Sequence, residues 1–137
     1  MRKLASIAAI VLGVILIVGG GATWYMVSDT LAEQEITTPD DACLPGRLVA
    51  GPFTAYCQAQ IIQEHTLDAT DGLTYAQLER DDPRRETAMN SSFLQASLFT
   101  SVVAFGVAAM AIGMGVIFIL IGLGIRDVAV RTGADQE

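Results

Sequence analysis

Two long apolar runs constrain the fold of this chain more than any other feature. They cover residues 4–27 and 98–125, and neither contains an acidic or basic side chain. Roughly 20 apolar helical residues cross the hydrocarbon core of a bilayer, which is about 30 Å thick, and both runs exceed that length. The runs predict an all-α membrane protein. We expect a two-helix transmembrane hairpin with a small, mainly helical loop domain at residues 28–97.

Composition and charge agree with a membrane protein. Hydrophobic residues make up 52% of the 137 residues, aromatic residues make up only 7%, and 13 residues are glycine. This balance is typical of membrane helices and not of a large soluble core. The net charge of −7 comes from the loop, which holds twelve of the 15 acidic residues and four arginines. An acidic surface repels phosphate, so a nucleic-acid partner is not expected.

Basic residues flank both runs on the sides that face the chain ends. Arg2 and Lys3 precede the first run, and Arg126 and Arg131 follow the second. Positive residues beside membrane segments stay in the cytoplasm. We therefore expect a plasma-membrane protein whose residues 1–3 and 126–137 are cytoplasmic and whose loop is extracytoplasmic.

The aromatic pair Trp24 and Tyr25 lies near the outer end of the first run. We expect these residues to anchor the outer interface, where such rings prefer to lie. A cleaved signal peptide is the alternative interpretation of this segment. The run exceeds the usual 7–15 apolar residues of a signal peptide, and no small-residue cleavage site follows it. An uncleaved anchor is favoured, and it places the loop in an oxidising compartment.

Small residues recur at intervals of seven in both runs, with others between them. Such faces let helix backbones approach closely in membranes. We expect them to pack the two helices against each other. A second face, with Gly106 and Gly113, leaves room for a membrane-protein partner or another copy of the chain. The predicted helix-packing residues are Ser6, Ala9, Gly13, Gly20, Ser101, Ala104, Ala108, Ala111, Gly115 and Gly122.

Turn and capping residues divide the loop. The first helix is expected to continue to Glu35, and further helices are expected at about 54–65 and, from a capping box at Thr74 and Gln77, at 74–80. The pair Asp82-Pro83 predicts the start of a helix that leads into the second run. A short strand-like piece is expected at 48–50. The apolar side chains expected to cluster in the loop are Phe53, Tyr56, Ile61, Ile62, Leu67, Leu73, Tyr75 and Leu78.

Cys43 and Cys57 are the only cysteines, and both lie in the loop. A pair in an oxidising compartment is typical of a disulfide, which would close a 15-residue loop and stabilise it by about 3 kcal/mol in the chain-entropy model. Free thiols or a redox pair are the alternatives, although the spacing is far from C-x-x-C.

No catalytic or metal-binding constellation is evident. His65 is the only histidine; with Glu64, Asp68 and Asp71 it offers few ligands for a metal. The hydroxyl groups of Thr87, Ser91 and Ser92 have no second histidine to activate them. We therefore expect no catalytic residue, no cofactor and no metal. Because neither run carries an ionisable residue, the chain alone is not expected to move protons or ions.

Several loop motifs resemble a family of small actinobacterial two-span membrane proteins. These motifs are GPFTA at 51–55, IIQEH at 61–65, ATDGLTYA at 69–76, RDDP at 80–83 and NSSFLQASLFTS at 90–101. Members often carry an automatic label of aromatic ring-opening dioxygenase. Such an enzyme needs an iron site, typically two histidines and a carboxylate, which one histidine does not supply. The resemblance implies a membrane protein of a high-GC Gram-positive bacterium.

The favoured hypothesis is a non-catalytic accessory, assembly or scaffold subunit of a cell-envelope membrane complex. Its partners would be the lipid bilayer and a membrane protein or a second copy of this chain. Two alternatives remain open: a metal-dependent oxidoreductase, as the automatic label suggests, and an extracytoplasmic sensor of a ligand or lipid.

Overall fold

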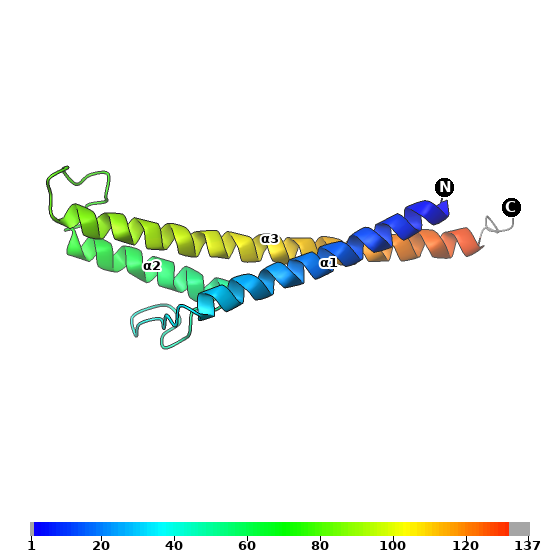
Figure 1. Cartoon of the computed structure of the whole chain (residues 1–137), viewed down its shortest axis with the longest axis horizontal. Helices are drawn as coiled ribbons and strands as arrows, with labels where there is room; N and C mark the ends of the chain where they lie inside the picture. Colours follow the sequence, from blue (N-terminus) through cyan, green and yellow to red (C-terminus); the bar gives the residue numbers. More distant parts are fainter. Residues whose placement is uncertain (1, 132–137) are drawn as a thin grey trace. The chain divides into compact units, whose positions relative to one another are not determined.

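The computed structural model describes residues 2–131, which form three helices: α1 (Arg2–Ala32), α2 (Pro52–Ala69) and α3 (Arg84–Arg131) (Figure 1). Within these residues the only β-type pairing is an isolated antiparallel bridge between Thr37 and Leu48. The predicted all-helical class is confirmed. Met1 and residues 132–137, which are half of the predicted cytoplasmic tail, lie outside the described residues.

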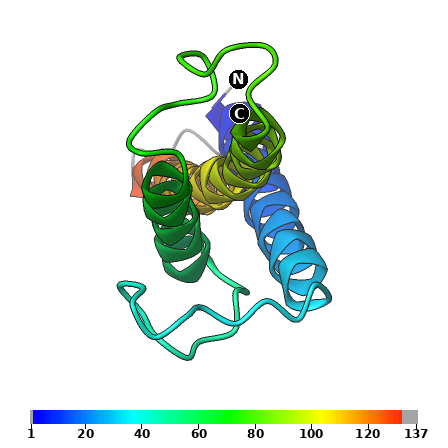
Figure 2. The same cartoon turned by 90° about the vertical axis from the view of Figure 1, so that its left-hand side faces the viewer.

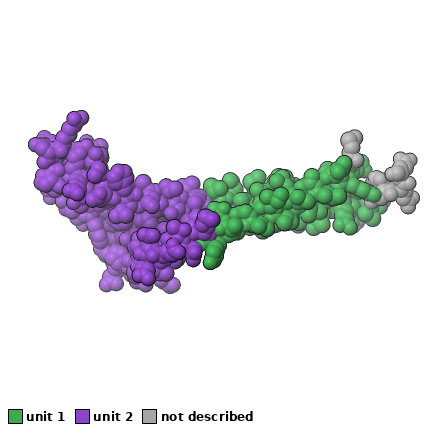
Figure 3. Space-filling model, in the orientation of Figure 1, with its two compact units in different colours: residues 1–25, 106–137 green, residues 26–105 purple. Residues whose placement is uncertain are grey.

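The chain forms two compact units (Figure 3). Unit 1 comprises residues 1–25 and 106–137, and unit 2 comprises residues 26–105. Each of the long helices α1 and α3 contributes residues to both units, whereas α2 belongs to unit 2 alone.

Unit 1 is an antiparallel pair of helix segments that buries only small side chains. In its described part the buried residues recur every seven positions: Ser6, Gly13 and Gly20 on α1, and Ala108, Gly115, Gly122 and Ala129 on α3. A strict seven-residue repeat keeps one face of each helix against its partner, as in a coiled coil.

Most large apolar side chains of unit 1 are exposed, whereas four partly buried isoleucines lie against the seam glycines: Ile10, Ile17, Ile112 and Ile119. Leu4 and Val18 on α1 are 73% and 65% exposed, and Leu120 on α3 is 62% exposed. Both helices are long and apolar enough to cross a membrane, and only 17% of the most apolar 18-residue stretch of each is buried. The core helix of a soluble protein would instead be mostly buried.

Unit 2 packs α2 beside the first part of α3, with the end of α1 completing the bundle (Figure 2). Its buried core contains Leu31 of α1, Val49 of the connection, Ala55 and Ala59 of α2, and Leu98 and Phe105 of α3. The alanines at 55 and 59 are fully buried, because four-residue spacing places them on the same face of α2. Their small size lets the helices approach.

The predicted apolar cluster of the loop is only partly correct. Ile61 and Leu78 are buried, but Phe53 is 76% exposed, and Tyr56 and Tyr75 are also exposed. The long helices supply Leu31, Leu98 and Phe105 to the core, and these residues take the place that the loop aromatics were expected to fill.

The helix boundaries differ from the expected ones for local reasons. Helix α1 ends at Ala32 and not at Glu35, because the last turn tightens through hydrogen bonds from the N–H groups of Gln34 and Glu35 to carbonyls three residues back, and Glu35 adopts a left-handed φ of 53°. Helix α2 is longer than expected. It begins at Pro52, a residue favoured in the first helical turn.

The prediction of a helix at 74–80 is wrong, because this segment forms a turn. The capping interaction itself exists, since Gln77 Oε1 accepts hydrogen bonds from the N–H of Thr74 (2.9 Å) and from its hydroxyl (3.0 Å). The helix does not continue because the guanidinium of Arg85 lies over the Tyr75 ring and donates to the carbonyl oxygen of Leu78. Helix α3 begins directly after Asp82-Pro83, as predicted.

Candidate functional sites

The small residues of unit 1 meet in three antiparallel pairs: Ser6 with Gly122, Gly13 with Gly115, and Gly20 with Ala108. The Ser6 hydroxyl donates a hydrogen bond of 2.7 Å to the carbonyl oxygen of Gly122. A Cβ atom placed on Gly13 would lie 2.6 Å from the Gly115 carbonyl oxygen, and one on Gly20 would lie 2.7 Å from that of Ala108. The two backbones are therefore in direct contact, which only small residues allow.

The other predicted packing residues lie beside or beyond these pairs. Ala9 and Ala111 are partly buried in unit 1. Ser101 and Ala104 are partly buried in unit 2, where the Ser101 hydroxyl donates to the carbonyl oxygen of Ser97 at 3.2 Å.

Five glycines of the long helices have open space where a side chain would lie. A Cβ atom on any of them would meet nothing within 4 Å, so they lie on open surface: Gly19, Gly21, Gly106, Gly113 and Gly124. The predicted interface anchors Trp24 and Tyr25 are 37% and 70% exposed.

Cys43 and Cys57 are joined as predicted, with their Cα atoms 5.4 Å apart, a separation normal for a disulfide. The bond ties the connection after α1 to the first turns of α2. The buried Thr38 organises the same connection: its hydroxyl bonds the carbonyl oxygen of Leu44, and its backbone exchanges hydrogen bonds with Arg47 and Gly46. The disulfide is thus part of a well-bonded segment.

The single histidine pairs with Asp41 and not with the acidic residues near it in sequence. His65 Nε2 lies 2.6 Å from Asp41 Oδ2, and both side chains are more than half exposed. This hydrogen bond raises the pKa of His65 above its ordinary value of 6.5 and lowers the pKa of Asp41. Within residues 2–131 no three His, Cys, Asp or Glu side chains gather closely enough to hold a metal ion.

A second charged group precedes α3. The carboxylate of Asp82 accepts the backbone N–H of Arg84 (2.8 Å) and a two-pronged contact from its guanidinium, which also reaches Asp71 at 2.7 Å. These bonds lower the pKa of Asp82 and raise that of Arg84. Asp82 therefore acts as the cap of α3, and Arg84 links that cap to the turn after α2.

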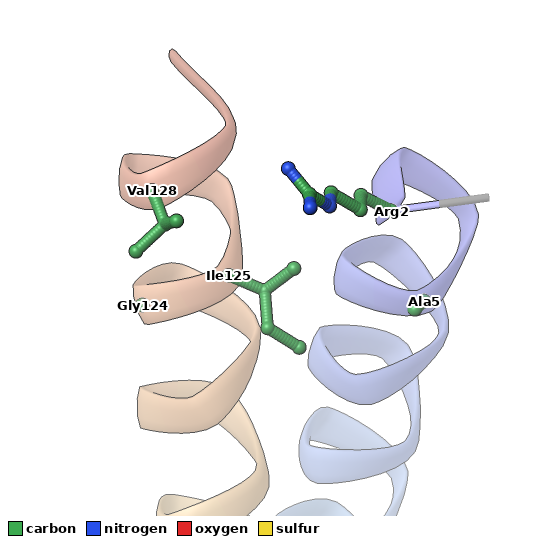
Figure 4. Close-up of a pocket in the computed structure, with 5 residues that line it drawn as sticks. All are labelled: Arg2, Ala5, Gly124, Ile125 and Val128. Atoms are coloured by element: carbon green, nitrogen blue, oxygen red, sulfur yellow. The ribbon is translucent and has the colours of Figure 1, made fainter. Parts of the chain in front are cut away.

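Two pockets lie where α1 begins and α3 ends. One, of about 600 Å³, is lined by Arg2, Ala5, Gly124, Ile125 and Val128, with the Arg2 side chain pointing from α1 toward α3 (Figure 4). The other, of about 350 Å³, adds Lys3 and Arg126 to apolar walls. Both combine basic groups with apolar walls, and neither contains a nucleophile paired with a base.

Two polar contacts and one unpartnered polar atom of unit 2 were not predicted from the sequence. The Ser28 hydroxyl of α1 donates to the Ala50 carbonyl oxygen at 2.6 Å. The hydroxyls of Thr66 on α2 and Ser91 on α3 bond each other. Gln58 of α2 has a buried side-chain oxygen, Oε1, with no hydrogen-bond partner among the described residues. Only the spacing of Gln58 from Ala55 and Ile62, which places it on the buried face of α2, could have drawn attention to it.

Comparison with protein-family models, with curated proteins and with solved structures finds no match to this chain.

Proposed function

We propose that this chain is a non-catalytic, two-span protein of the plasma membrane, an accessory or scaffold subunit that carries unit 2 on the outer side. The observation that carries the proposal is the arrangement of unit 1. The fully buried positions of its described part are all small residues, while most of its large apolar side chains are exposed. Soluble proteins rarely expose so much contiguous apolar surface, and a bilayer would cover it.

The flanking charges support the orientation. Arg2, Lys3 and Arg126 belong to one end of unit 1, and Trp24 and Tyr25 to the other end of the α1 segment. With the basic end in the cytoplasm, the disulfide-bearing unit 2 would lie in the oxidising compartment, where such bonds persist.

The open glycines support the role of a subunit. Gly106 and Gly113 occupy one helix seven residues apart and have nothing within 4 Å. A second helix could approach the backbone of α3 there, as helices do at small-residue faces in membranes. The partner would be another membrane protein of the cell envelope or a second copy of this chain. The resemblance to small actinobacterial two-span proteins is part of the same proposal.

Purification in mild detergent tests the proposed role. The tagged chain should co-purify with a membrane protein or with an untagged second copy. Gly106→Leu together with Gly113→Leu should abolish this association, while Gly19→Leu together with Gly21→Leu, on the open surface of α1, should preserve it. Recovery of a lone monomer would contradict the subunit role. Stoichiometric iron or zinc that is lost in His65→Ala would instead support the oxidoreductase alternative.

A further inference from the structure

A cavity of about 590 Å³ lies inside unit 2, between the end of α1, the middle of α2 and the first half of α3. Its apolar walls include Leu31, Ile62 and Leu98, one from each helix. Pockets that bind small molecules have volumes of about 300–1,000 Å³ and are mostly apolar with a few polar groups. The cavity falls within that range.

The polar side chains that line this cavity are uncharged, and three of them present an acceptor: Thr30, Gln58 and Ser101. No residue that lines it carries a charge. The Thr30 hydroxyl donates to the Met26 carbonyl oxygen (2.8 Å) and the Ser101 hydroxyl to that of Ser97 (3.2 Å), so each oxygen keeps only its acceptor capacity toward the cavity. Gln58, which also lines it, has a buried Oε1 that accepts no hydrogen bond from any described residue.

A buried acceptor without a donor is costly, and native proteins rarely leave one unexplained. Gln58 lies on the same face of α2 as the fully buried Ala55, so its side chain is held against the core. A ligand with a hydroxyl or N–H donor would satisfy Oε1. A free anion or cation would find no opposite charge here.

The cavity borders large apolar side chains that remain exposed. Met26 of α1 is 67% exposed and Leu94 of α3 is 53% exposed, and both form part of its wall. Met26 belongs to the first apolar run, and Leu94 lies just before the second. In a membrane-inserted chain this side would meet lipid near the outer interface, so an acyl chain could enter between the helices.

We infer that the cavity of unit 2 binds an uncharged membrane lipid, with an acyl chain against Leu31, Ile62 and Leu98 and a hydroxyl group that donates a hydrogen bond to Gln58 Oε1. The inference rests on the proposed membrane location. It adds to the subunit role a site at which unit 2 takes a neutral, hydroxyl-bearing lipid such as a monoacylglycerol.

Photo-crosslinking of the full chain in vesicles tests this inference. Two probes carry the same diazirine-bearing acyl chain, one as a monoacylglycerol with free hydroxyls and one as a methyl ester without a donor. Wild-type protein should favour the first probe by roughly two- to tenfold, the value of one hydrogen bond. Mass spectrometry should place the adducts beside Leu31, Ile62 or Leu98.

Gln58→Leu should remove the preference between the probes and leave acyl-chain labelling. Gln63→Leu, the same change on the exposed face of α2, should keep the preference. Equal labelling by the two probes in wild type, adducts in unit 1 only, or an unchanged preference in Gln58→Leu would each overturn the lipid site. If the chain were absent from the membrane fraction, the proposed function itself would fail; if it were present without the preference, only the lipid site would fail.

Discussion

At Gly13, a Cβ atom would lie 2.6 Å from the Gly115 carbonyl oxygen and 3.0 Å from the Ile119 nitrogen. The Cγ1 atom of Ile119 also lies 2.7 Å away, but the other two neighbours are backbone atoms, which cannot rotate away as a side chain would. At Gly19, on the same helix, a Cβ would meet nothing within 4 Å. The two glycines therefore differ in packing while sharing their helical environment.

Gly13→Leu should lower the free energy of unfolding in detergent by about 1–3 kcal/mol, the usual cost of overpacking. Gly19→Leu should be neutral or stabilising by up to about 1 kcal/mol, because glycine is a poor helix former. Denaturant titration followed by circular dichroism measures both values. Equal destabilisation in the two variants would contradict the seam.

We expect the pH to affect the two members of the His65–Asp41 pair in opposite directions. Because the pKa of His65 is raised, the hydrogen bond stabilises the fold fully below pH 6.5, the ordinary pKa of histidine. This stabilisation is lost as pH rises through the raised pKa. Because the pKa of Asp41 is lowered, the stabilisation that Asp41 provides is lost as pH falls through that lowered pKa. The pair is therefore strongest in mildly acidic solution, between the two transitions.

NMR titration of the single histidine measures this contact directly. In Asp41→Asn the pKa of His65 should fall toward 6.5, because the hydrogen bond to Asp41 is the main cause of the shift. Asp68→Asn should lower it less, since Asp68 acts only through its charge at a distance. An unchanged pKa in Asp41→Asn would show that the pair does not form in solution.

Sequence patterns predicted single residues well where one constraint dominates. The seven-residue spacing of small residues correctly predicted that Gly13 and Gly20 share one face of α1, and that Gly115 and Gly122 share one face of α3. Helical periodicity alone determines such a face. The register between helices was not accessible, because any seven-residue shift keeps small residues opposite each other. Asp41 as the partner of His65 was also missed, since the pairing depends on the fold of the connection after α1.

At the scale of elements, the disulfide restrains the connection between α1 and α2. Its closure of a loop with a sequence separation of 14 should stabilise unit 2 by about 3 kcal/mol in the chain-entropy model. Reduction should therefore speed amide hydrogen exchange at Thr38, Gly46 and Val49, whose N–H groups bond within the connection. The amides of the α3 segment in unit 1 serve as the internal control. Uniform exchange changes, or none, would contradict a local restraint.

The start of α3 depends on Asp82. Its side chain is only 17% exposed and bonds both the N–H and the guanidinium of Arg84. Asp82→Ala should lower the melting temperature of the chain in detergent, since it removes the acceptor that caps the helix. Asp81→Ala, at the exposed neighbouring position, should leave it unchanged. The same effect from both variants would indicate a general charge effect and no specific cap.

Element boundaries followed from sequence only where local signals agreed with tertiary contacts. Helix α3 starts after Asp82-Pro83 because the Asp82 side chain and the Pro83 backbone both favour a helix start. The capping box at Thr74 formed but gave no helix, because Arg85 captured the Leu78 carbonyl oxygen. The cavity beside Gln58 could not be predicted, since it depends on how three helices separate inside unit 2.

At the scale of the whole molecule, the central claim is that the apolar faces of α1 and α3 lie in a bilayer, with the disulfide on the outer side. Both helices pass the length and hydropathy requirements for a span, and the outward Leu, Ile, Val and Met side chains of unit 1 need an apolar surrounding. In this arrangement Cys43 and Cys57 lie outside the cytoplasm, and a partner or lipid would bind from within the membrane.

Cysteine labelling on intact cells tests this claim most directly. After treatment with a membrane-impermeant reductant, a membrane-impermeant maleimide should modify the exposed Cys43 without permeabilisation. The labelled chain should stay in the membrane pellet after alkaline carbonate extraction. Cys43→Ser/Cys57→Ser gives the background, and Thr132→Cys in that variant should react only after permeabilisation. Labelling of Cys43 only in permeabilised cells, or release of the chain by carbonate, would contradict the account.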